Sequence, residues 1–74
     1  MSPTQCKAAR ALLNWTQLFL AESSGLSKST IIDFELGRRD VSLAAQQAMR
    51  KALEDGGVIF LKDGRSEGVK KIND

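Results

Sequence analysis

The stretch from Gln17 to Gly37 constrains the fold more than any other part of the chain. Two short helical patterns are separated by Ser24-Gly25, and Ala21 lies four residues before the glycine. A small side chain lets two helices cross closely, and a glycine takes the positive φ that a tight turn demands. Apolar anchors follow at the spacing by which one helix lies across another: Leu26, Ile31 and Phe34. The stretch therefore predicts two short helices that cross at a tight turn.

This is the helix-turn-helix pattern, over about residues 17–36, and its second helix is offered to the major groove of DNA. Ser27 is expected to cap that helix, and Lys28, Ser29 and Thr30 follow. A lysine at a helix start opposes the helix dipole, so a purely structural helix would favour an acid there. One cation and two hydroxyls suit phosphates and base edges. We therefore predict that Lys28, Ser29 and Thr30 contact DNA.

Charged residues continue along and beyond this second helix. Asp33 is expected to face outward, where it could accept a hydrogen bond from cytosine N4 or pair with a nearby arginine. Gly37 should end the helix as a left-handed cap. Arg38 and Arg39 come directly after it. We predict that these two arginines contact the phosphate backbone.

Further helices are predicted on both sides of this motif. Ser2 to Gln5 has the form of a capping box with proline at the first helical position. The helix that it opens should face inward through a stripe of small and apolar residues: Cys6, Ala9, Leu12 and Leu13. A fourth helix should start at Asp40 or Ser42 and run to about Glu54. Its apolar side is expected to close the core.

The end of the chain reads as extended structure. Val58, Ile59, Phe60 and Leu61 form a short β-type run, a turn is expected over 62–64, and a second extended piece over 69–72. The residues between, up to Gly68, are polar and read as loose. Four consecutive apolar residues are too many for a solvated edge, and an unpaired edge invites another chain. We predict a helical DNA-binding domain over 1–57 and a dimerisation element over 58–74.

Composition narrows the function classes. The chain has 74 residues, enough for one small domain, and 42% of them are apolar. Its single cysteine cannot form an internal disulfide, which favours a reducing cytosol and predicts a cytoplasmic protein. A net charge of +2 permits nucleic acid as a partner. The sequence contains no histidine, no paired acids and no glycine-rich phosphate loop, so nothing in it suggests an enzyme. It also predicts no cofactor, metal, small-molecule ligand or membrane span.

Residues 5–57 resemble the phage-repressor/Cro-like (XRE) family of helix-turn-helix regulators. The residues that carry the resemblance are Arg10, Gln17, Leu20-Ala21, Gly25-Leu26-Ser27, Ser29-Thr30-Ile31, Phe34-Glu35 and Gly37. The resemblance implies a compact, mainly α, four-helix domain like that of lambda repressor, which binds operator DNA as a dimer and has no enzymatic activity. It also implies that Gln17, Lys28, Ser29 and Asp33 contact bases or phosphates. By position it pairs Arg10 with Glu35.

Two function classes remain open on the sequence. The first is a repressor or dual regulator that binds a palindromic operator as a homodimer, which the cations and hydroxyls around the second helix favour. The second is a protein-interaction module, such as an antitoxin or antiactivator, that uses the same fold to hold a partner. Phe19, Leu36 and Asp33 favour this alternative, because the first two are apolar where polar or basic residues are usual and the third brings negative charge.

Overall fold

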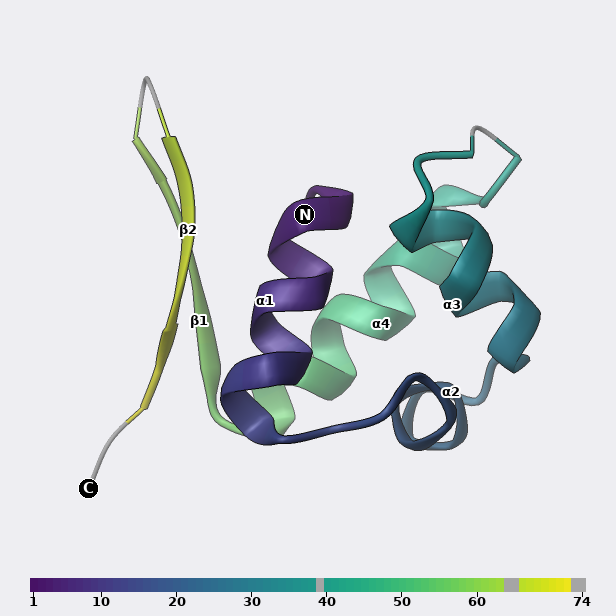
Figure 1. Cartoon of the computed structure of the whole chain (residues 1–74), viewed down its shortest axis with the longest axis horizontal. Helices are drawn as coiled ribbons and strands as arrows, with labels where there is room; N and C mark the ends of the chain where they lie inside the picture. Colours follow the sequence, from purple (N-terminus) through teal and green to yellow (C-terminus); the bar gives the residue numbers. More distant parts are fainter. Residues whose placement is uncertain (39, 64–65, 73–74) are drawn as a thin grey trace.

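The computed structural model describes residues 1–38, 40–63 and 66–72. Within these residues the chain forms four helices followed by two antiparallel strands: α1 (Pro3–Leu13), α2 (Gln17–Ser24), α3 (Lys28–Glu35), α4 (Leu43–Asp55), β1 (Val58–Asp63) and β2 (Ser66–Lys71). Helices α2 and α3 lie at one end of the molecule and the strands at the other, with α1 and α4 between them (Figure 1). The predicted fold class, mainly α with a short C-terminal β-hairpin, is confirmed.

Local sequence fixes where each of these helices begins. The hydroxyl groups of Ser2, Thr16, Ser27 and Ser42 each accept a hydrogen bond from the backbone N–H three residues later. At α1 the capping box is complete, because the backbone N–H of Ser2 also donates to Oε1 of Gln5 at 2.9 Å. The caps predicted at Ser2 and Ser27 are therefore confirmed, and of the two starts left open for the fourth helix the structure has Ser42.

The core is built from every described helix and from the first strand. Its buried members are Cys6, Ala9, Leu20, Ala21, Ile31, Phe34, Met49, Ala52, Leu53 and Val58. One expected member is wrong: Leu12 is 40% exposed. The packed side of α1 runs through Gln5, Cys6 and Ala9 to Leu13, which leaves Leu12 at its margin in the last turn.

The two strands pair more extensively than the sequence predicts. Phe60 lies opposite Val69, and the same register continues through Leu61 opposite Gly68 to Asp63 opposite Ser66. The expectation that the residues up to Gly68 are loose is therefore wrong for 66–68. Polar residues continue the ladder because pairing uses backbone groups and does not require apolar side chains.

The hairpin packs on the helices of its own chain. Val58 is buried, and Phe60 and Val69 pack against the core. The buried amide of Gln5 donates from Nε2 to the carbonyl oxygens of Leu61 and Gly68, both at 3.1 Å. Because Val58 belongs to the core, the boundary after Gly57 separates secondary structures but does not divide the packing.

A close contact joins the start of α2 to the end of α4. The Trp15 ring meets the Phe19 ring edge-on, with centroids 4.7 Å apart. The same ring also lies against Gly56, where an added Cβ would come within 2.7 Å of it. A side chain at this position would therefore force Trp15 or Leu13 to move.

Candidate nucleic-acid interface

The turn between α2 and α3 fixes how the second helix lies on the first. Gly25 has φ +73°, the left-handed conformation predicted for it. The backbone N–H of Leu26 donates to the carbonyl of Ala21 at 2.9 Å. Ala21 itself is buried at the crossing of the helices. The arrangement leaves the start of α3, at Lys28 and Ser29, exposed.

The start of α3 carries the hydroxyls and the cation that the sequence singled out. Lys28 and Ser29 are exposed. The Ser27 hydroxyl lies 3.0 Å from that of Ser29 and 2.8 Å from that of Thr30. Lys28 and Ser29 are thus available to a ligand, whereas Thr30 is half-buried to one side.

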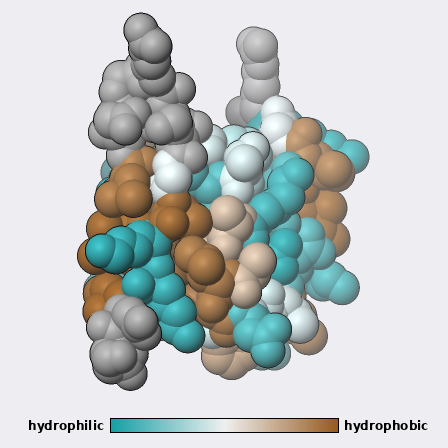
Figure 2. Space-filling model, turned by 60° about the vertical axis from the view of Figure 1, so that its left-hand side comes forward, coloured by the Kyte–Doolittle hydropathy of each residue, from teal (hydrophilic) through white to brown (hydrophobic). Residues whose placement is uncertain are grey.

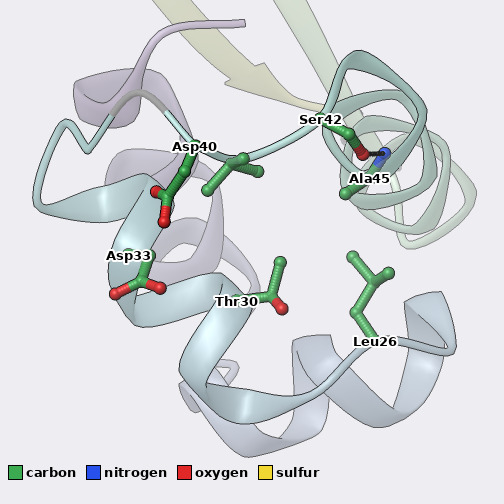
Figure 3. A pocket seen from close by; sticks show the side chains of 7 residues that line it. Leu26, Thr30, Asp33, Asp40, Ser42 and Ala45 are labelled. Carbon is green, nitrogen blue, oxygen red and sulfur yellow. Dashed lines mark hydrogen bonds between the residues drawn. The ribbon is translucent and has the colours of Figure 1, made fainter.

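Thr30 faces a groove of about 320 Å³ between α3 and the start of α4. The groove is lined by Leu26, Thr30, Asp33, Asp40, Val41, Ser42 and Ala45. Figure 3 shows the carboxylates of Asp33 and Asp40 at one end of it and the side chains of Leu26 and Ala45 at the other. Two carboxylates make that end unfavourable for phosphate.

Asp33 is paired within the chain. Its carboxylate forms an ion pair with the guanidinium of Arg38, whose side chain is 59% exposed against 30% for Asp33. The sequence left two partners open for Asp33, a cytosine and a nearby arginine. In the free protein its partner is the arginine. Gly37, at φ +81°, makes the turn that brings Arg38 back toward α3. Arg39 lies outside the described residues.

Behind α3, Glu35 collects four hydrogen bonds. Arg10 donates to both carboxylate oxygens at 2.7 Å, from Nε and from Nη2. The Gln17 amide donates to Oε1 at 3.1 Å, and the Cys6 thiol donates to Oε2 at 3.2 Å. Arg10 also reaches the carbonyl of Trp15 at 3.0 Å. The structure thus brings Arg10 and Glu35 together and adds two partners from α1 and α2.

These contacts set the ionisation of the cluster. Burial by itself would raise the pKa of Glu35, but the hydrogen bonds from Arg10, Gln17 and Cys6 outweigh it, and the pKa is lowered. Burial, then the hydrogen bond to Glu35, raises the pKa of the Cys6 thiol far above its ordinary value. Glu35 is therefore a carboxylate and Cys6 a protonated donor. The cluster anchors α3 to α1 and α2.

Gln17 and Cys6 show what sequence reasoning missed here. Gln17 was expected at the DNA, but its amide nitrogen is engaged by Glu35 inside the protein. Cys6 was read as a plain core residue, although it lies one helical turn before Arg10 and shares that residue's partner. The four-residue spacing of Cys6 and Arg10 could have indicated the hydrogen bond from Cys6 to Glu35, because residues four apart lie on the same side of a helix.

The four residues predicted for dimerisation divide between two faces. Val58 is buried, and Phe60 lies under the guanidinium of Arg50, 5.1 Å from the ring centroid. Ile59 and Leu61 are 43% and 47% exposed. Apolar and hydrophilic surface lie side by side on the hairpin side of the molecule (Figure 2). The hairpin lies at the end of the molecule opposite α3 (Figure 1).

Over residues 1–38, 40–63 and 66–72, no three histidine, cysteine, aspartate or glutamate side chains converge as metal ligands. In the same part of the chain, no helix combines the length and apolar character needed to cross a membrane.

Comparison with known families identifies the motif. A helix-turn-helix family model matches residues 7–54, more than half of the chain. The match runs from the middle of α1 to the last turn of α4 and includes the whole α2–α3 unit. The search of curated proteins found no match. The chain therefore belongs to the XRE family of helix-turn-helix proteins and is a DNA-binding regulator at the family level.

Proposed function

We propose that the protein is a sequence-specific transcriptional regulator, a repressor or dual regulator, that binds a palindromic operator as a homodimer. One observation carries this proposal. Lys28 and Ser29 stand exposed at the start of α3, and the buried Glu35 cluster holds that helix to α1 and α2. A fixed helix with exposed donors suits base reading, because misplaced donors lose hydrogen bonds that depend strongly on geometry.

The side chains around α3 would take different roles. Lys28 and Ser29 would contact base edges or adjacent phosphates, and Arg38 would contact a phosphate. Asp33 would either keep Arg38 in place or accept a hydrogen bond from cytosine N4. For Gln17 we propose a positioning role, because its amide nitrogen is already bound to Glu35.

A gel-shift experiment tests this function. Double-stranded DNA of random sequence is selected against the full chain, and the enriched sequences are titrated with excess competitor DNA present. Lys28→Ala and Ser29→Ala should each weaken specific binding by about 1–3 kcal/mol, while non-specific binding changes less. Lys7→Ala is the matched control, because Lys7 is an exposed lysine on α1. Failure to enrich any sequence would refute the proposal.

We further propose that two copies join through the outer face of the hairpin. Ile59 and Leu61 support this, since both point away from the helices and are nearly half exposed. Each described strand also has a single neighbour in the sheet, which leaves a second edge to pair with another chain. A dimer is needed because specific sites usually contain two half-sites about one helical turn apart.

The dimer is tested by replacing Ile59 and Leu61 with threonine, which retains β propensity and removes apolar area. The double variant should sediment as a monomer with an unchanged circular dichroism spectrum. Lys71→Thr is the control and should remain a dimer, because exposed Lys71 lies opposite the buried Val58, on the other face of the hairpin. If the double variant remains a dimer, the interface lies elsewhere.

A second candidate function rests on α2. Leu18 and Phe19 are 50% and 46% exposed and adjacent. Exposed apolar residues side by side favour a protein partner, as in an antitoxin or antiactivator. The selection experiment separates the two functions, because a pure protein-binding module enriches no DNA sequence.

A further inference from the structure

Two apolar side chains lie on the outer side of α3. Leu36 is 63% exposed, and Ile32 is only half-buried. The backbone N–H of Leu36 donates to the carbonyl of Ile32 at 3.0 Å, so the helical geometry continues through Leu36. Residues four apart in a helix lie on the same side, one turn from each other. Ile32 and Leu36 therefore form a short apolar strip.

The charges around the strip indicate what it meets. Exposed Lys28 lies one turn before Ile32, and exposed Arg38 lies two residues after Leu36. The only carboxylate of α3 on this outer side, Asp33, is already paired with Arg38. Lys28, Asp33 and Arg38 together leave one net positive charge beside the strip, and this suits a polyanion more than an apolar protein surface. It shares this side of α3 with Ser29, the exposed hydroxyl already assigned to DNA.

DNA offers such a strip one chemical partner. In the major groove the bases present hydrogen-bond donors and acceptors, and the exposed hydrocarbon group is the C5-methyl of thymine. Leucine and isoleucine side chains have no hydrogen-bonding atoms, so they distinguish bases through that methyl group.

We propose that Ile32 and Leu36 are specificity-determining residues that contact thymine methyl groups, so that each operator half-site contains at least one required thymine. This inference rests on the proposed DNA-reading function of α3. It assigns a role in recognition to Leu36, a residue that the sequence alone associated with a protein partner.

The test uses the full chain and the DNA sequences selected above. Each thymine of the selected half-site is replaced in turn by uracil, which pairs identically and lacks only the methyl group. At one or two positions the wild-type affinity should fall about fourfold, the ratio expected for one buried methyl. Leu36→Ala or Ile32→Ala should lower affinity for the thymine operator. The variant should then lose no further affinity when uracil replaces the thymine whose methyl group that side chain contacts. Leu36→Met, which keeps the apolar reach, should retain most of the discrimination.

Leu12→Ala is the control, because Leu12 is a partly exposed leucine on α1. It should leave the thymine-to-uracil ratio unchanged. If wild-type protein binds every uracil-substituted operator as tightly as the thymine operator, the inference is wrong even though a selected sequence exists. If no sequence is selected, the DNA-reading function itself fails.

Discussion

Glu35 is the residue on which the placement of α3 depends. It receives hydrogen bonds from Arg10 and Cys6 of α1 and from Gln17 of α2, and its side chain is 4% exposed. A buried carboxylate without partners would cost several kcal/mol. The donors together offset this cost, and they tie three helices to one point.

We expect a strong coupling between Arg10 and Glu35. Arg10→Met or Glu35→Leu alone should destabilise the fold by roughly 3–5 kcal/mol, because each leaves a buried partner unsatisfied. The double variant should lose much less than the sum of the two. Urea denaturation of the four proteins of the cycle measures this. Additive losses would mean that the contact contributes nothing to the free energy of unfolding.

The same carboxylate predicts a pH dependence of stability. Folding lowers the pKa of Glu35 below its ordinary value of 4.5, so its stabilising charge is fully present above that pH. The contribution is lost as the pH falls below 4.5 and passes through the lower pKa of the folded state. In Tm measurements from pH 7 to pH 2, the advantage of wild type over Glu35→Gln should shrink in that acid range.

Glu22→Gln is the control for the pH series, because Glu22 is an exposed acid on α2. Its Tm should follow that of wild type at each pH. A constant difference between wild type and Glu35→Gln down to pH 2 would contradict the link between the Glu35 charge and stability.

At the scale of elements, the end of α4 packs so closely on Trp15 that a side chain at Gly56 would force its neighbours to move. Gly56→Ala should destabilise the protein by about 1–3 kcal/mol, because its Cβ would lie 2.7 Å from Trp15 and 2.9 Å from Leu13. The backbone at Gly56 is right-handed, with φ −76°, so the loss is steric.

Gly68→Ala provides the matched control for that substitution. A Cβ at Gly68 would meet its nearest atom, on Leu61, at 3.9 Å, which is ordinary contact. Thermal unfolding should therefore distinguish the two glycines. Equal Tm values for Gly56→Ala and Gly68→Ala would show that the Trp15 ring moves aside without cost.

The helix starts and the α2–α3 turn could be predicted from sequence, because a capping hydroxyl or a left-handed glycine acts within four residues of its own position. The contact of Gln5 with the hairpin could not be predicted from sequence. Its capping contact is local, but its bonds to Leu61 and Gly68 span more than fifty residues. The hydrogen bond from Gln17 to Glu35 could not be predicted either, since the partner lies on another helix.

At the scale of the whole molecule, the proposed dimer would make each phosphate contact twice, once in each half-site. If Arg38 contacts one phosphate in each half-site, Arg38→Ala should flatten the slope of log K against log salt by about 0.9 per subunit. Binding to all sequences should weaken together. Lys51→Ala, an exposed lysine that pairs with Asp55 on α4, should leave the slope unchanged. An unchanged slope for Arg38→Ala would leave Arg38 only its pair with Asp33.

The contact between Trp15 and Gly56 also makes Trp15 an intrinsic fluorescence probe of the packing at this point. Trp15 is the single tryptophan of the sequence, which contains no tyrosine, so ultraviolet emission excited beyond the phenylalanine band arises from one ring. That ring touches Phe19 of α2 and the end of α4 together. Separation of these helices would expose it to water and shift its emission to longer wavelength. Unfolding can therefore be followed without any attached dye, at the junction between α2 and the end of α4.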